Sequence, residues 1–260
     1  MGSREENKSQ RKAEIIDAAR RLIRNKGQQG GTAFSMRSLA EQAGVSIATP
    51  YNLFGSKQAI LVAVLDEDFA EFQTGLALIE SGGLEAVFEA LALMQRQFSG
   101  DPDFYRNVFA AISTEAGPEL RFVLSGPRYA FWKRLLREAT QAGLLDAEVD
   151  PDAFAITLSQ IMQANVREWS TGYLELEEMD ARIRYGVALV LSAIATPSGA
   201  PQLKKRLQAA EQDLQTIWRT VLRQRLQEGK LSEASRMVLA DQLKHIGTPI
   251  LEQPEEETTT

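Results

Sequence analysis

The chain has 260 residues, of which 44% are hydrophobic and 25% charged, an ordinary globular balance with room for one large or two modest domains. The absence of cysteine excludes disulfides and thiolate sites, no apolar run approaches the ~18 residues of a membrane span, and the N-terminus lacks a secretion-signal pattern, so we expect a cytoplasmic protein without membrane contact. The net charge of −6 divides into +5 over residues 1–60 and −11 over the remainder, which gives a basic head for phosphate and an acidic body.

Apolar residues recur at three- and four-residue spacing along nearly the whole chain, and no segment indicates a strand. The sequence therefore predicts an all-α protein of about ten or eleven helices. After an N-terminal arm over residues 1–10, the first helix should end at Gly27, before a turn over residues 28–31. Its expected buried face consists of Ile15, Ile16, Ala19, Leu22 and Ile23.

The next stretch predicts two short helices around a turn. Ser35 is a good N-cap for the first helix, and Gly44 stands where a helix end favours a left-handed residue. Ser46 is expected to cap the second helix, which ends at Gly55-Ser56. This is the plan of a DNA-binding helix-turn-helix, in which one helix braces the DNA backbone and the next lies in the major groove. We expect the DNA-binding domain to span residues 11–58.

The second short helix is the candidate for reading DNA. Its small side chains would let the backbone sit deep in a groove about 12 Å wide, and its apolar residues would meet thymine methyl groups. Thr49 and Asn52 can hydrogen-bond to base edges or phosphates, and the Tyr51 hydroxyl can reach a phosphate. Arg37 and Lys57, the latter beside the free N–H groups of the following helix, are expected to hold phosphates. The expected DNA-binding residues are Ser35, Arg37, Ser46, Ile47, Ala48, Thr49, Pro50, Tyr51, Asn52 and Lys57.

The sequence motifs from Ala19 through Gly27, from Ser35 through Ser46 and from Tyr51 through Ile60 together resemble the TetR/AcrR family of bacterial transcriptional regulators. The resemblance covers about residues 11–65. It implies a homodimer on a palindromic DNA operator, usually a repressor released by a small molecule. Pro50 and Asn52 depart from the family pattern, which commonly has Leu, Val or Ile before this Tyr and His or Tyr soon after it.

Helical patterns continue through the acidic body. Helices are expected after Gly82-Gly83, from Pro102 to Gly117, and over residues 119–142, where Pro127 should kink the helix or split it in two. Asp150-Pro151 opens another helix.

Residues 59–250 are expected to form one helical domain for ligand binding and dimerisation. After the break at Pro197 to Pro201, a short heptad-like seam runs over residues 203–221, and Gly229 should end that helix. These extra C-terminal helices (residues 198–250) exceed the family norm. The acidic tail over residues 251–260 is expected to be disordered.

The apolar stripes of the body can serve two functions, as a dimer interface or as the lining of a ligand pocket. The helices over residues 151–170 and 180–195 resemble the pair that forms a four-helix dimer interface in the family, and an intramolecular core is the alternative. The expected dimer residues are Leu158, Val166, Ile183, Gly186, Val187, Val190 and Ile194.

Aromatic and methionine side chains gather in the helices that should enclose a pocket for a small apolar effector. Asn165 falls on the apolar side of its helix and should bond either a neighbouring helix or a polar group of the ligand. The expected ligand-binding residues are Phe88, Met94, Phe98, Phe104, Tyr105, Phe109, Phe131, Trp132, Met162, Asn165 and Trp169.

An enzyme is the first rival interpretation. The single histidine, His245, lies near the polar C-terminus, and the chain has neither a nucleotide-binding glycine pattern nor metal-ligand spacing. We therefore predict no catalytic residue, no cofactor and no metal. The remaining alternative is a DNA-binding regulator without a small-molecule inducer, controlled by a protein partner on the C-terminal helices.

Overall fold

The computed structural model describes residues 2–27, 34–77, 82–115, 118–227 and 232–246, with side chains described over 5–25, 34–77, 82–112, 128–227 and 232–246. Within these ranges the chain forms eleven helices and no strand apart from one isolated bridge between Leu145 and Ala195. The all-α prediction is confirmed. Nowhere in the described part is a helix both long and apolar enough to cross a bilayer.

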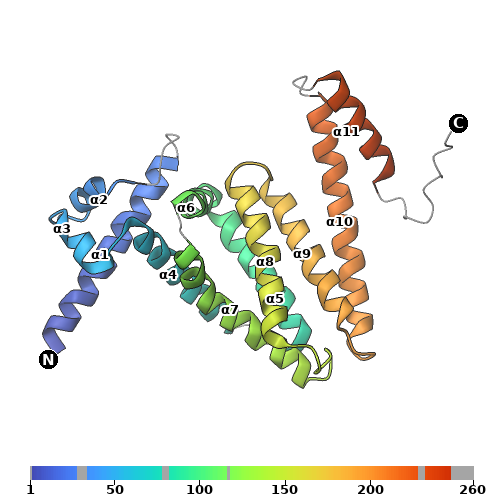
Figure 1. The fold of residues 1–260 in the computed structure, drawn as a ribbon, viewed down its shortest axis with the longest axis horizontal. Coiled ribbons are helices and arrows are strands. Elements are labelled where there is room, and N and C mark those ends of the chain that lie inside the picture. The colour runs from blue at the N-terminus through green and yellow to red at the C-terminus, as the bar shows by residue number, and fades with distance from the viewer. Residues whose placement is uncertain (1, 28–33, 78–81, 116–117, 228–231, 247–260) are drawn as a thin grey trace, which may run out of the picture.

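The first four helices form the head of the molecule and its link to the body (Figure 1). Residues 2–10, which we expected to be a separate arm, are the first turns of the first helix. The buried face predicted for that helix is present, with Leu22 only half-buried at its edge. The four helices are α1 (Gly2–Gly27), α2 (Met36–Gln42), α3 (Ala48–Phe54) and α4 (Lys57–Ala77).

The body is a bundle of five further helices, with two more along one side (Figure 1). Helix α4 packs against α1 on the head side and against the first three bundle helices on the other, so it joins the two parts. The remaining helices are α5 (Gly83–Gly100), α6 (Pro102–Glu115), α7 (Pro118–Gln141), α8 (Pro151–Ser170), α9 (Leu176–Ala193), α10 (Ala200–Gln227) and α11 (Glu233–His245).

Helix α7 passes through Pro127 without interruption, so the predicted split into two helices is wrong. A proline removes one backbone donor, and the turns on either side keep their own hydrogen bonds. The predicted kink stays a prediction. The turn over 28–31, Gly117, the expected helix end at Gly229 and the tail over 251–260 lie outside the described residues.

The C-terminal addition consists of α10 and α11, and it packs on the body through the contact between α10 and α9. Leu203, Ala210 and Leu214 on the predicted seam of α10 are buried, and the Trp218 indole N–H donates to Glu178 of α9 at 3.0 Å. Helix α11 packs on α10 but buries none of its own side chains. The seam is therefore used for packing within the chain.

Candidate nucleic-acid interface and effector cavity

Helix α2 begins with reciprocal hydrogen bonds between two serines. The Ser38 N–H donates to the Ser35 hydroxyl at 3.0 Å, and the Ser35 N–H donates to the Ser38 hydroxyl at 3.1 Å. The predicted cap is confirmed, and this capping box fixes where the helix starts. At the other end, Gly44 has a φ of +65°, as the turn between α2 and α3 requires.

The start of α3 differs from the sequence-based expectation. Ile47 has helical backbone angles and occupies the capping position, without any side-chain cap. The Ser46 hydroxyl instead lies 2.9 Å from the Thr49 hydroxyl, while its carbonyl oxygen accepts the Thr49 N–H at 2.9 Å. The prediction that the Ser46 side chain caps α3 is therefore wrong.

One side of α3 faces solvent. Ile47 and Tyr51 are 51% and 49% exposed, Ala48 and Asn52 are also exposed, and Thr49 is half-buried beside them. Pro50 is buried, which corrects its placement among the exposed DNA-reading residues. It shares the inward face with Leu53 and Phe54, since positions three and four residues apart lie on one side of a helix.

Two of the expected phosphate-binding cations lie on α2 and α4, the helices that pack against α3. Arg37 projects from the first turn of α2 and is exposed. Lys57 is the first residue of α4 and is half-buried, with its ammonium 5.5 Å from the centre of the Phe34 ring. The Ser56 hydroxyl caps α4 by accepting the Ala59 N–H at 3.1 Å. The helix N-terminus and both cations can thus meet an anionic backbone.

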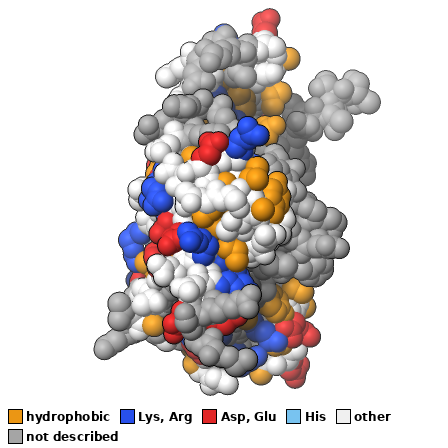
Figure 2. Space-filling model, turned by 90° about the vertical axis from the view of Figure 1, so that its left-hand side faces the viewer, with side chains coloured by type: hydrophobic (Ala, Val, Ile, Leu, Met, Phe, Trp, Pro, Cys, Tyr) orange, Lys and Arg blue, Asp and Glu red, His pale blue; other side chains and the backbone are white. Residues whose placement is uncertain are grey.

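Sequence analysis missed the contribution of the first turns of α1. They form one wall of a groove whose other wall contains Thr49, Asn52 and Leu53 of α3. Lys8 and Arg11 lie on the α1 side. Figure 2 views the molecule from this end, where Lys and Arg side chains are interspersed with apolar, uncharged and some acidic ones. The available signal was the absence of proline and glycine between Ser3 and Lys26, since neither helix-breaking residue interrupts that stretch.

A cavity of about 410 Å³ lies among α4, α5, α6, α7 and α8. Its walls are mainly aromatic and aliphatic. Six of the eleven expected ligand-binding residues line it, namely Met94, Phe98, Tyr105, Phe109, Trp132 and Met162. Phe69 and Phe72 of α4 also line it, although sequence analysis did not select them. A cavity of this size and character suits a small, largely apolar molecule.

Four of the expected aromatic residues lie outside the cavity lining because they pack elsewhere. Phe88 faces α10, where the Arg206 guanidinium lies 5.0 Å from its ring centre. Phe104 lies under Arg20 and Arg24 of α1. Trp169 stacks behind Phe98 with ring centres 5.6 Å apart, and Phe131 packs edge-on against Phe69 and Phe72.

Asn165 also lies outside the lining, and it makes neither of the expected contacts. Its side-chain amide donates to the Ile161 carbonyl oxygen at 2.8 Å, within the same helix. An intrahelical acceptor one turn back satisfies this donor without a ligand or a second helix.

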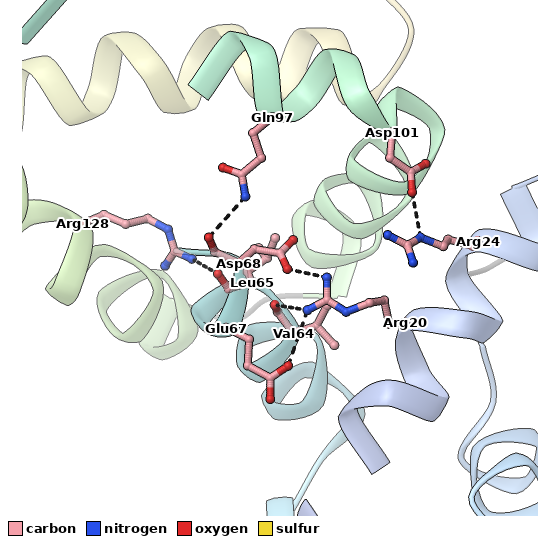
Figure 3. A network of polar contacts seen from close by, with 9 residues as sticks. All are labelled: Arg20, Arg24, Val64, Leu65, Glu67, Asp68, Gln97, Asp101 and Arg128. Carbon is pink, nitrogen blue, oxygen red and sulfur yellow. Dashed lines mark hydrogen bonds and ion pairs between the residues drawn. The ribbon is translucent and has the colours of Figure 1, made fainter. Parts of the chain in front are cut away.

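A network of polar groups closes the end of the cavity nearest the head (Figure 3). Asp68 of α4, only 3% exposed, forms an ion pair with Arg20 of α1, which also reaches Glu67 at 3.4 Å. Gln97 donates its amide to the Asp68 carbonyl oxygen at 3.2 Å, and Arg128 donates to the Leu65 carbonyl oxygen at 3.1 Å. The network joins the head to the cavity wall.

The charges in this network shift the pKa of their neighbours. Burial acts to lower the pKa of Arg20, but its contacts with Asp68 and Glu67 outweigh burial and raise it. Burial and the charge of Asp68 raise the pKa of the Tyr105 phenol. Arg20 is therefore held as a cation and Tyr105 as a neutral donor.

The expected dimer residues are mostly occupied within the chain. Leu158, Ile183 and Val187 are buried, and a Cβ on Gly186 would lie 3.0 Å from Ile161 of α8, so this stripe is the contact between α8 and α9. Val166 lines the cavity. Val190 and Ile194 are half-buried against the chain's own core. These placements correct the assignment for Leu158, Ile183 and Val187, because side chains buried in one chain cannot pack on a second copy. The assignment of the four half-buried residues stays a prediction.

Two large apolar side chains on the same helix pair are exposed instead. Ile156 of α8 is 49% exposed and Leu189 of α9 is 46% exposed. Sequence analysis missed them because the periodicity of a helix locates an apolar stripe but does not say which neighbour covers it.

The head of the molecule is the part whose sequence is similar to known proteins. Residues 15–64 match the family model "Bacterial regulatory proteins, tetR family". The HTH-type transcriptional regulator BetI of Rhizobium meliloti is 42% identical over 55 residues, which are 21% of this chain and 26% of BetI. The match thus spans about a quarter of that relative.

Solved structures are similar over more of the chain. FadR of Thermus thermophilus, described as a TetR family transcriptional repressor in complex with lauroyl-CoA, has a TM-score of 0.60 at 17% identity and covers 70% of this chain and 93% of its own. FadR of Bacillus subtilis in complex with stearoyl-CoA has a TM-score of 0.53 at 19% identity. The similar region covers 70% of this chain and 98% of that FadR chain. At such identities the likeness shows a shared fold.

Proposed function

We infer that this chain, which belongs to the tetR family of bacterial regulatory proteins, is a homodimeric repressor that binds a palindromic operator and is released by a small apolar molecule. The observation that carries the proposal is the exposed face of α3, held between a capped α2 and the N-terminus of α4. A short helix presented in this way can enter the major groove while its neighbours hold the phosphates. Action on DNA would place the protein in the cytoplasm.

Different residues are assigned to positioning and to reading. Arg37 and Lys57 would bind phosphates and so set affinity on any sequence. Thr49 and Asn52 carry the polar groups of the exposed α3 face and would contact base edges, while Ile47 and the other apolar groups there would meet thymine methyl groups. Pro50 is reassigned to packing, because it is buried.

The dimer would set the spacing of the two heads. A palindrome requires the two copies of α3 to lie about one DNA turn apart, ~34–36 Å. We propose the exposed surface of α8 and α9 around Ile156 and Leu189 as the self-complementary contact. A two-fold axis there would leave both heads free.

A ligand bound in the cavity would regulate operator binding. It borders α4, the helix that also packs on α1 of the head. A molecule that fits better when the heads are misaligned would lower operator affinity by a coupling free energy of typically ~1–3 kcal/mol. The acyl-CoA complexes of the FadR proteins support a role for an apolar ligand in this fold.

The test is selection of bound DNA from a random pool by the purified full-length chain. We expect an enriched palindrome whose half-sites lie one DNA turn apart, and a complex with two chains per site. Recovery of random sequences, or binding by a single chain, would contradict the proposal.

Control by a protein partner is a second candidate function. It is favoured by α11, which exposes Met237 and Val238 and buries none of its own side chains. Deletion of α11 should leave effector release intact if the first proposal is right. It should abolish regulation in cells if the partner model is right.

A further inference from the structure

The cavity opens to solvent along one side of α8. Among the described side chains that line the cavity, those from α4, α5, α6 and α7 are buried or half-buried, and every exposed one belongs to α8. The exposed lining residues are Gln160, Gln163, Ala164 and Arg167. Because their spacing of three, one and three positions places them on one side of a helix, they form a single, mostly polar edge of the opening.

Arg167 brings an unpaired positive charge to this edge. Its guanidinium forms no ion pair and no hydrogen bond with any described residue. The edge contains no carboxylate, and its other polar groups are the neutral side-chain amides of Gln160 and Gln163. A guanidinium without a partner, one helical turn from an amide that can also donate, is suited to bind an anionic group.

The charges deeper in the cavity do not cancel this preference. Asp68, the acid among the described lining residues, is buried, pairs with Arg20 and has a side-chain hydrogen bond with Tyr105. Burial lowers the pKa of Arg128, and its ion pair with Asp66 offsets this only in part. A negative charge in the cavity would therefore favour the charged form of Arg128 as well. One carboxylate against two guanidiniums leaves the described lining with a net positive charge.

We propose that the effector is an apolar chain that ends in an anionic group, a carboxylate or a phosphate, and that Arg167 binds this group at the opening of the cavity. This inference rests on the proposed function, whose cavity it specifies. The anionic oxygens accept two N–H groups from the Arg167 guanidinium and one from the Gln163 amide. The apolar chain lies further in, among Phe69, Phe72 and Trp132.

A neutral or cationic head group fits this edge less well. A protonated amine at the opening would face Arg167 and would find no acceptor there, since a guanidinium only donates hydrogen bonds. A hydroxyl group could accept one hydrogen bond but would leave the charge of Arg167 unbalanced. Because Arg167 is exposed, water and salt weaken its attraction for an anion, and we expect a preference of about fivefold.

The proposal is tested first on the unaltered protein with four ten-carbon probes that differ only in the head group. Tryptophan fluorescence and calorimetry follow the binding of decanoate, decyl phosphate, decanol and decylamine, each below its micelle or solubility limit. We expect at least one anion to bind about fivefold or more tightly than both decanol and decylamine. The tighter anion identifies the head group as carboxylate or phosphate. Equal binding of all four probes, tightest binding of decanol or decylamine, or no binding of either anion overturns the proposal.

Variants locate the head group. Arg167→Met removes the charge and keeps an unbranched apolar stem, so affinity for the tighter anion should fall about fivefold with little change for decanol. Arg96→Met is the matched control, because Arg96 is an exposed arginine of α5 outside the cavity lining, and its anion affinity should be unchanged. No loss in Arg167→Met, or an equal loss in the control, overturns the assignment. Thermal unfolding checks that both variants are folded.

The effector role is measured on the selected operator. A saturating concentration of the tighter anion should weaken operator binding by at least about fivefold. Arg167→Met should raise the anion concentration for half-maximal release about fivefold and leave operator affinity without probe unchanged. Release at an unchanged concentration, or anion binding without any effect on operator affinity, overturns the inference. Probe binding is measured without DNA, so the absence of operator binding by the unaltered protein rejects the proposed function instead.

Discussion

Neutralising the two cations that we propose as phosphate-binding residues, Arg37 and Lys57, should change the salt dependence of operator binding by a calculable amount. Arg37 is exposed, so Arg37→Met removes its charge without loss of packing. Lys57 packs against Phe34, and Lys57→Met keeps the apolar stem in that place. The two residues lie on α2 and α4, the helices that pack against α3.

The expected magnitude follows from the release of counterions. Each phosphate contact contributes roughly 0.9 to the slope of log affinity against log salt concentration, and a dimer loses two contacts per substitution, a change of about 1.8. Between ~50 mM and ~200 mM salt the unaltered protein should therefore lose about twelvefold more affinity than either variant. The selected operator and a shuffled duplex should show the same change.

Fluorescence anisotropy titrations over this salt range measure the slopes directly. Lys204→Met is the matched control, because Lys204 is an exposed cation on α10, away from the head (Figure 1). Its slope should equal that of the unaltered protein. A slope unchanged in Arg37→Met and Lys57→Met, or lowered equally in the control, would refute the assignment of these two residues to the phosphates.

Three further substitutions test other parts of the account. Asn52→Ala should relax sequence preference at one base pair per half-site in a repeated selection, and uniform weakening on all sequences would speak against base contact. Ile156→Glu combined with Leu189→Glu should yield monomers in light scattering. Dimers that persist in this double variant would show that the interface lies on another surface. Gly199→Ala should lower the free energy of unfolding by at least ~2 kcal/mol, because its Cβ would lie 2.1 Å from the Leu144 carbonyl oxygen. An unaltered thermal stability would contradict this expectation, because it would show that the backbone before α10 shifts at little cost to make room for the added Cβ.

Local rules predicted the local features of the head well. The Ser35 cap, the left-handed Gly44 and the helix break at Gly55 each depend on a few neighbouring residues, and all three are present. The order of helices followed from the spacing of apolar residues. Ser46 was misassigned because capping also depends on the backbone angles of Ile47, which the sequence does not display.

The features that require the tertiary structure could not be predicted in this way. Pro50 is turned inward by the packing of a very short helix, and Asn165 finds its acceptor within its own helix. The contact between Arg20 and Asp68 joins residues 48 positions apart, so no spacing rule marks it. The cavity likewise depends on which faces of five helices meet.

The central claim is that two copies of α3 enter successive major grooves of one duplex. The most direct measurement is hydroxyl-radical footprinting of the full-length chain on its selected operator, with the stoichiometry of the complex measured in parallel. The account predicts two protected half-sites centred one DNA turn apart and two chains per duplex. A single protected patch under one chain, or no protection at low salt, would contradict it.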